Sequence, residues 1–217
     1  MSIDFEQARF AMIEQQVRPW QVLDQRVLAA MTEVPREDFV LPQHRKLAFA
    51  DLALPLEHGE FMLKPVLEGR MLQSLDLQPE DEVLLVGTGS GYMTACLARL
   101  ARDVLSVDRH GDFVERVRQR LASLGASNAR VEQADALHWQ PGRQFDAICV
   151  TGALAREPEA FRGWLKDGGR LLIVRGESPS QEAVRIVRRG DSFVEESLFE
   201  TDIPYLHGAA PAPQFTL

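Results

Sequence analysis

The chain has 217 residues, of which 45% are hydrophobic, and its net charge is −8 at pH 7. This length predicts one α/β unit with additional elements, and the apolar content is sufficient for a packed core. The negative charge argues against nonspecific binding to nucleic acid or to an anionic membrane, because both partners attract basic surfaces.

Residues 1–50 have the pattern of short helices separated by prolines. Asp4 is placed to cap a first helix, which Pro19 ends. Asp24 is placed to cap a second helix, and Pro35 is expected as the first residue of a short third helix that contains Phe39. The sequence therefore predicts a helical N-terminal extension.

Residues 51–64 are expected to form a loop, because Pro55, His58 and Gly59 interrupt any apolar period. Pro65 then begins a helix that continues to about Leu75. We assign residues 1–78 to a helical N-terminal region.

From residue 81 onward, strand and helix patterns alternate along the chain. Strands are expected at residues 83–86, 104–107, 129–133, 145–150, 170–174, 183–187 and 193–199. Helices are expected at residues 92–101, 112–124 and 158–165, and a turn at residues 167–169. This alternation predicts an α/β fold with a mostly parallel sheet and helices on both faces. We assign residues 79–217 to a Rossmann-like core that forms one compact unit with the N-terminal region.

A glycine-rich loop follows the first core strand, with the sequence Gly87-Thr88-Gly89-Ser90-Gly91-Tyr92. Glycines permit a tight turn and close approach of a ligand to the backbone. The following helix N-terminus offers free N–H groups and the positive end of its dipole. These features predict a cofactor crevice at the carboxyl end of the strand. A dinucleotide fingerprint requires a glycine where Tyr92 stands, so a nicotinamide cofactor is disfavoured.

Asp108 ends the next predicted strand, about 20 residues after the glycine loop. A carboxylate at this spacing is placed to accept two hydrogen bonds from a ribose diol. The competing interpretation is a glycine turn beside a surface aspartate.

The remaining chemistry-bearing residues form no recognised catalytic arrangement. Cys96 and Cys149 fall inside a helix pattern and a strand pattern, which favours buried free thiols and a reducing, cytoplasmic location. Residues 1–6 lack the basic and apolar regions of a secretory signal. No apolar run approaches the roughly 20 residues that span a bilayer. The 5 histidines show no metal-ligand spacing, so no metal site is predicted.

Taken together, these motifs resemble the protein-L-isoaspartate O-methyltransferase family, which uses S-adenosylmethionine. The residues that carry the resemblance are Gln16-Val17-Arg18, Val34-Pro35-Arg36, Ala48-Phe49-Ala50-Asp51, the segment Gly87 to Tyr92, Phe145-Asp146, and Asp167-Gly168-Gly169-Arg170. The resemblance implies a Rossmann-like methyltransferase fold and a protein-repair activity. It also implies a protein or peptide partner carrying L-isoaspartate, whose carboxylate accepts the methyl group.

The resemblance also implies roles for individual residues. Cofactor contacts are implied for the loop and strand-end residues Gly87, Thr88, Gly89, Ser90, Gly91, Asp108, Asp135, Ala136, Val150 and Thr151. Among these, Asp108 would hold the ribose hydroxyls, and Asp135 would accept from the adenine amino group with Ala136 against the ring. Val150 and Thr151 would approach the reacting end. An ordinary turn carboxylate is the alternative interpretation of Asp135.

The sequence departs from the family pattern in three places. Leu85 stands where an acid usually helps to hold the cofactor amino group, and alanines replace the glycines that usually flank Asp135. The third departure lies in residues 51–64. The resemblance implies that the N-terminal region 1–78 forms part of the site that binds the methyl acceptor, so we call this segment the acceptor loop. The usual His-Gly-Gln-Thr-Ile-Ser-Gln-Pro reads His58-Gly59-Glu60-Phe61-Met62-Leu63-Lys64-Pro65 here. Two hydroxyl positions over the transfer centre have become apolar.

Candidate acceptor-site residues are therefore His58, Glu60, Phe61, Leu63 and Lys64. A histidine before a glycine in a loop fits a structural hydrogen bond as well as catalysis, and no other base is evident. Three functions stay open. They are methylation of isoaspartyl residues, methylation of a different acceptor by the same fold, and weak turnover in a cofactor-binding protein that acts through a partner. No feature of the sequence indicates an oligomeric state.

Overall fold

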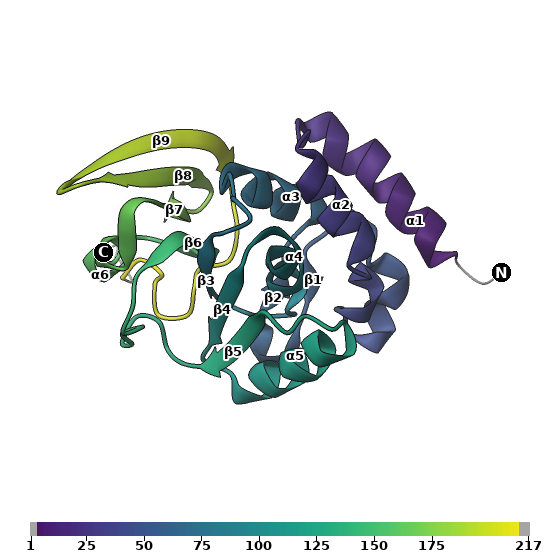
Figure 1. Cartoon of the computed structure of the whole chain (residues 1–217). Helices are drawn as coiled ribbons and strands as arrows, with labels where there is room; N and C mark the ends of the chain where they lie inside the picture. Colours follow the sequence, from purple (N-terminus) through teal and green to yellow (C-terminus); the bar gives the residue numbers. More distant parts are fainter. Residues whose placement is uncertain (1–3, 213–217) are drawn as a thin grey trace, which may run out of the picture.

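The computed structural model describes residues 4–212 and contains one large sheet with the strand order β5-β4-β3-β6-β7-β8-β9 (Figure 1). Its strands are β3 (Glu82–Val86), β4 (Asp103–Asp108), β5 (Ala129–Gln133), β6 (Phe145–Leu154), β7 (Leu165–Glu177), β8 (Ser180–Arg189) and β9 (Ser192–Thr201). The first five strands of this order, from β5 to β7, pair in parallel, whereas β8 and β9 add an antiparallel edge. The predicted mostly parallel sheet is confirmed.

Alternate side chains of the sheet enter two apolar layers. Val83 and Leu85 of β3 pack with the N-terminal helices and with α4 and α5, whereas Leu84 and Val86 pack on the opposite face with α6. The helices are α3 (Pro65–Ser74), α4 (Tyr92–Leu100), α5 (Gly111–Ser123) and α6 (Glu159–Gly163). Both faces therefore carry helices, as predicted, although the face of α6 has only this short one.

The N-terminal region begins with α1 (Phe5–Met12), in which the Asp4 carboxylate accepts from the N–H of Gln7 as a cap. The prediction that Pro19 ends this helix is wrong. The chain continues through a wide turn at Ile13–Val17 and a 3₁₀ turn at Arg18–Trp20, and Gln21 ends it in a left-handed conformation. Proline fits inside that 3₁₀ turn because the first turn of a helix leaves its N–H groups unpaired.

Two further predictions in this region need correction. Asp24 does cap α2 (Gln25–Glu33), but Pro35 precedes the next 3₁₀ turn, Arg36–Asp38, and Phe39 follows that turn. A second 3₁₀ segment spans Pro42–Leu47.

The acceptor loop is not irregular throughout. It contains a small hairpin of β1 (Leu54–Pro55) and β2 (Phe61–Met62), joined by a 3₁₀ turn at Glu57–Gly59. The N–H of Leu56 donates to the carbonyl of Glu60 at 2.8 Å. Strands of two residues leave no periodic sequence signal, which explains why this hairpin was not predicted.

The second half of the sheet also differs in detail from the sequence prediction. The expected turn at residues 167–169 lies within β7 as a bulge, because Phe145 pairs with Leu165 and Ala147 with Arg170. The helix expected at 158–165 is only α6. After β9, the segment 203–209 returns to the end of β6, where Ala153 and Tyr205 form a parallel bridge.

Across residues 4–212, the structure has no helix that is both long enough and apolar enough to cross a membrane. Residues 1–3 of the stretch that was inspected for a secretory signal lie outside the described residues.

Candidate functional site

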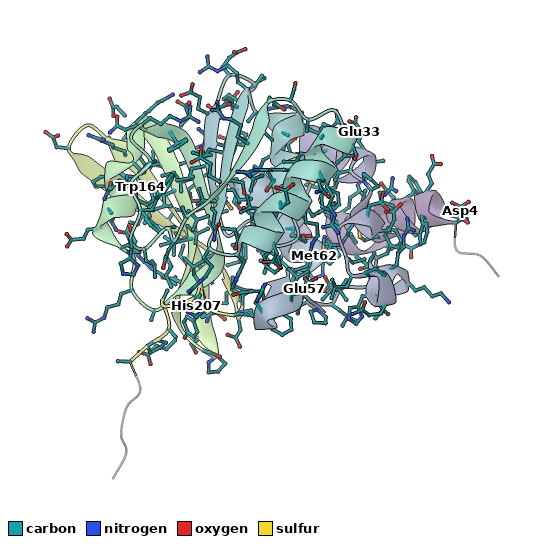
Figure 2. The ribbon with its side chains drawn as sticks, turned by 90° about the horizontal axis from the view of Figure 1, so that it is seen from below. Asp4, Glu33, Glu57, Met62, Trp164 and His207 are labelled. Atoms are coloured by element: carbon teal, nitrogen blue, oxygen red, sulfur yellow. The ribbon has the colours of Figure 1, made fainter. Side chains whose placement is uncertain are left out.

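A cavity opens at the carboxyl ends of the parallel strands β3, β4 and β6, where open α/β sheets bind their ligands. Its lining combines strand ends, the acceptor loop and the segment 203–209, which we call the C-terminal segment. The lining residues are Glu60, Phe61, Leu63, Val86, Gly87, Gly89, Val107, Asp108, Arg109, His110, Phe113, Ala134, Asp135, Ala136, Thr151, Gly152, Pro204, Tyr205, Leu206 and His207. Figure 2 shows Glu57 of the acceptor loop and His207 of the C-terminal segment in the lower half of the molecule, with Met62 nearer its centre.

The floor of the cavity requires glycine at position 87. Gly87 has a φ of +88°, and a Cβ atom there would lie 2.3 Å from Oγ1 of Thr151. The Thr151 hydroxyl donates to the carbonyl of Gly87 at 2.7 Å, so this contact fastens the glycine loop to β6. The absence of a side chain thus allows the end of β6 to close against the loop.

Asp108 connects the glycine loop with the start of α5. Its carboxylate accepts from the N–H of Gly89 at 2.8 Å and from the N–H of His110 at 2.9 Å. Asp108 is 7% exposed and lines the cavity. Each carboxylate oxygen has a second lone pair, so the group can also accept from a ligand diol.

Asp135 and Ala136 line the cavity just after β5, next to the end of β4, where the N–H of Ala134 donates to the carbonyl of Asp108 at 2.8 Å. Oδ1 of Asp135 accepts from the N–H of Leu137 at 3.1 Å, which closes a local turn. Oδ2 lies 3.3 Å from Nδ1 of His138. The carboxylate therefore has a turn-forming role as well as a position in the cavity wall.

Four predicted cofactor residues do not line the cavity. The Thr88 hydroxyl lies 2.6 Å from the Ser106 hydroxyl in the interior, and the Ser90 hydroxyl accepts from the N–H of Tyr92 at 3.2 Å. Gly91 has a packing role, because a Cβ atom there would lie 2.6 Å from Val117. Val150 is likewise buried in the apolar layer, since alternate strand residues point away from the site.

The acceptor loop contributes Glu60, Phe61 and Leu63 to the cavity, but neither His58 nor Lys64. Phe61 is 43% exposed at the mouth, and Leu63 is buried. His58 is turned toward α5, and its Nε2 donates to both oxygens of Asp112 at 3.0 Å. Catalysis by His58 has no support in this geometry, whereas the structural interpretation has direct support.

Two side-chain contacts, of Glu57 with Arg116 and of His58 with Asp112, fasten the acceptor loop to α5. Arg116 donates to Glu57 at 2.9 Å, and this hydrogen bond holds the pKa of Glu57 below its usual value. Burial acts to raise the pKa of Asp112, but the hydrogen bond from His58 and the nearby Arg116 charge bring it below its usual value. Both carboxylates are thus ionised at neutral pH and attract their partners.

The fold brings together two histidines that the sequence spacing kept apart. The rings of His58 and His110 stack with centroids 4.2 Å apart and planes 2° apart, and with Asp112 they place three ligand atoms within 4.8 Å. A metal ion binds in the plane of each imidazole, and two parallel stacked planes do not meet at one ion. The arrangement therefore matches ring stacking and hydrogen bonding to Asp112 better than metal ligation.

Sequence reasoning missed the C-terminal segment as part of the site. Ala153 donates to the carbonyl of Pro204 at 2.9 Å, and Leu206 donates to the carbonyl of Ala153 at 2.8 Å. A Cβ atom at Gly152 would lie 2.6 Å from the backbone of Leu206, so this glycine permits the close approach. Only the apolar run from Ile203 to Leu206 hinted at this position.

The model of the protein-L-isoaspartate(D-aspartate) O-methyltransferase family matches residues 7–205. The chain belongs to this family. A protein-L-isoaspartate O-methyltransferase from Herpetosiphon aurantiacus is 34% identical over 210 residues, which cover 96% of this chain and 94% of the relative. A protein-L-isoaspartate O-methyltransferase 2 from Pelobacter propionicus is 39% identical over 196 residues, covering 89% and 87% of the two chains.

A solved structure supports the fold independently. A protein-L-isoaspartate O-methyltransferase from Plasmodium falciparum, in complex with S-adenosyl-L-homocysteine, superposes with a TM-score of 0.80. It is 21% identical, and the match covers 91% of this chain and 97% of that chain. The Rossmann-like methyltransferase fold predicted from the sequence is confirmed.

In this protein-L-isoaspartate O-methyltransferase family member, Leu85 takes the place of the usual acid without leaving a gap. Its side chain is fully buried in the apolar layer beneath the N-terminal helices, between β4 and β6. The Leu85 side chain does not line the cavity.

Proposed function

We propose that this protein transfers the methyl group of S-adenosylmethionine to the carboxylate of L-isoaspartyl residues in proteins. The observation that carries the proposal is one cavity in which Gly87 and Asp108 face the acceptor-loop residues Phe61 and Leu63. Membership of the family and the named relatives support the same activity.

The chemistry of the donor set fits S-adenosylmethionine. The Asp108 carboxylate is held in place by two backbone N–H groups and would accept from the ribose hydroxyls. Asp135 would accept from the adenine amino group, and Ala136 would lie against the ring. The glycine loop would lie along the methionine part, where Gly87 and Gly89 leave room for close approach. When bound, the sulfonium supplies an electrophilic methyl group.

The protein's own contribution to transfer is alignment and exclusion of water. An acceptor carboxylate has a pKa of about 3.9 in model peptides, so it is ionised at neutral pH and needs no general base. Phe61, Leu63 and Leu206 form apolar walls that would exclude water from the transfer path. The pairing of His58 with Asp112 is consistent with a reaction that uses no base.

The direct test is transfer of labelled methyl from S-adenosylmethionine to an isoaspartyl peptide, with the matching normal aspartyl peptide as control. We expect labelling of the isoaspartyl peptide alone. Binding of S-adenosylhomocysteine is measured by calorimetry in parallel. Tight binding without labelling would refute the isoaspartyl assignment, and it would leave a different acceptor or a partner-directed role of a weakly active protein.

One observation favours a different acceptor as the second candidate. Phe61 and Leu63 line the cavity at the two positions where the family usually has hydroxyls. The double variant Phe61→Thr with Leu63→Ser restores these hydroxyls. If the wild type lacks isoaspartyl activity and the double variant gains it, the acceptor of this protein has changed; equal activity of both proteins would exclude this alternative.

We also propose a cytoplasmic location. Cys96 and Cys149 are free and buried, as expected for a protein in a reducing compartment.

A further inference from the structure

A fully buried arginine lies directly beneath the acceptor loop. Arg36 has no exposed surface, and its Nη1 pairs with the carboxylate of Glu68 on α3, which is also buried. Its other nitrogens donate to backbone carbonyls, Nε to Ala48 at 2.7 Å and Nη2 to Leu63 at 2.7 Å. All three nitrogens of the guanidinium thus have partners, on three different segments.

The same guanidinium also contacts the helix that follows the glycine loop. Its Cζ lies 4.8 Å from the ring centroid of Tyr92, the first residue of α4, which is a favourable distance for a cation–π contact. Arg36 therefore connects Leu63, whose side chain lines the cavity, with the helix that begins where the glycine loop ends.

The anchor matters because the hydrogen-bonded side chains that attach the acceptor loop to α5, Glu57 and His58, precede the residues that line the cavity. Phe61 and Leu63 carry no polar side-chain atoms, so they cannot be oriented by hydrogen bonds of their own. The orientation of these two residues therefore comes from packing and from the backbone that carries them, and the Leu63 carbonyl is the backbone group that the buried arginine holds.

We propose that Arg36, held by Glu68, is a positioning residue that fixes the acceptor loop against the cofactor-side helix α4. The guanidinium acts through the Leu63 carbonyl and does not touch the cavity itself. The structural part of this inference stands without the proposed function, and only its consequence for the acceptor rests on that function.

The test replaces the buried pair by apolar side chains of similar length, Arg36→Met with Glu68→Leu. Such replacements of a buried ion pair often leave stability unchanged or raise it, so the double variant is expected to fold. Amide hydrogen exchange is then measured over residues 56–64. We expect exchange there to become about tenfold faster, because local opening no longer breaks the contact to Leu63.

A conservative variant covers the case in which the double variant does not fold. Arg36→Lys keeps the charge beside Glu68 but replaces the planar fork of donors by a single ammonium, which cannot serve diverging partners in the same way. The expected result is again faster exchange over residues 56–64, smaller than in the double variant.

The matched control is Arg26→Lys. Arg26 also joins two backbone carbonyls, those of Leu77 at 2.7 Å and Leu100 at 2.6 Å, and both lie outside the acceptor loop. Its variant should leave exchange over residues 56–64 unchanged. Unchanged exchange in a folded Arg36 variant, or an equal increase in the Arg26 control, would overturn the proposal.

The activity measurement separates the two inferences. In the Arg36→Met, Glu68→Leu variant, KM for an isoaspartyl peptide should rise about tenfold while the affinity for S-adenosylhomocysteine, measured by calorimetry, stays within about twofold. A loss of cofactor affinity with unchanged KM would contradict a role toward the acceptor. If no peptide is methylated by any variant, the proposed function fails, and the exchange result still decides the role of Arg36.

Discussion

The cofactor-side wall and the acceptor-side wall of the cavity are fastened in different ways. On the cofactor side, a backbone-to-carboxylate hydrogen bond joins Gly89, in the loop after β3, to Asp108 at the end of the neighbouring parallel strand β4. On the acceptor side, the loop is held by charged side chains that are distant in sequence, with Arg36 from below and Asp112 and Arg116 from α5.

This difference shows how the fold separates a fixed site from an adaptable one. The glycine loop and the tip of β4 follow from the parallel sheet itself, so changes there disturb the fold. The acceptor loop depends on side-chain contacts, and its lining residues can change while the frame is kept. The replacement of hydroxyls by Phe61 and Leu63 has occurred on this second wall.

The largest expected effect concerns pH and the buried carboxyl on the acceptor side. Burial raises the pKa of Glu68 to about 7 from 4.5, against the lowering influence of Arg36, and Tyr92 and Cys96 of α4 also face this cluster. The proton that folded Glu68 retains stabilises the protein fully below pH 4.5. This stabilisation is lost as the pH rises through about 7.

The stabilisation lost over this pH range is on the order of 3 kcal/mol, at about 1.4 kcal/mol for each unit by which the pKa of Glu68 is raised. Urea unfolding of the wild type and of Glu68→Gln between pH 4.5 and pH 8.5 measures it. We expect the free energy of unfolding of the wild type to fall relative to that of the variant across this range. Parallel curves would mean that Glu68 does not titrate there, and the two walls would then not differ in pH response.

On the cofactor side, Asp108→Ala should weaken binding of S-adenosylhomocysteine by about 1–3 kcal/mol, because hydrogen bonds to a charged group are lost and two N–H groups lose their acceptor. Calorimetry measures the affinity. The matched control is Asp103→Ala, at the other end of β4, where the carboxylate pairs with Arg130 and Arg143 outside the cavity. Equal affinity of wild type and Asp108→Ala would show that the ribose assignment is wrong.

A pair of glycine substitutions tests whether the cofactor-side wall is limited by space. Gly87→Ala should destabilise the protein by about 1–3 kcal/mol, because a residue with positive φ is strained and its Cβ would meet Thr151. Gly125→Ala also has a positive φ, of +66°, but no atom lies within 4 Å of its Cβ position. Thermal unfolding of both variants isolates the steric part of the cost, and equal losses would contradict a tight contact at Gly87.

The core of the fold was predictable because its signals are local and periodic. The strand and helix around the glycine loop, and Asp108 at the tip of the next strand, follow from apolar runs, glycine chemistry and spacing. The hairpin at Leu54–Met62 was not predictable, since strands of two residues carry no period. The sequence Asp167-Gly168-Gly169 predicted a turn where the structure has a bulge within β7. The two are hard to distinguish from sequence, because both use a glycine with positive φ, as Gly168 has here.

The site was predictable only where the sheet itself builds it. Gly87, Gly89, Asp108 and Thr151 line the cavity as expected, whereas Gly91 serves helix packing. Which side of a loop a hydroxyl takes depends on tertiary contacts, so Thr88 and Ser90 were assigned to the cavity although their hydroxyls bond within the protein. The place of the C-terminal segment in the cavity wall and the Arg36 anchor could be seen only in the folded chain, because their partners are distant in sequence.

The smallest expected effect concerns the exposed side of the acceptor loop. His58→Ala removes the contact with Asp112. The side chain of His58 is 42% exposed and that of Asp112 is 48% exposed. Exposed ion pairs contribute about 0–1 kcal/mol, so the free energy of unfolding in urea should fall by less than about 1 kcal/mol. Hydrogen exchange over residues 56–64 should rise less than in the Arg36 variants. A loss of stability above about 2 kcal/mol, or faster exchange than in Arg36→Lys, would contradict this expectation. The contact with α5, rather than the buried arginine, would then be the principal attachment of the acceptor loop.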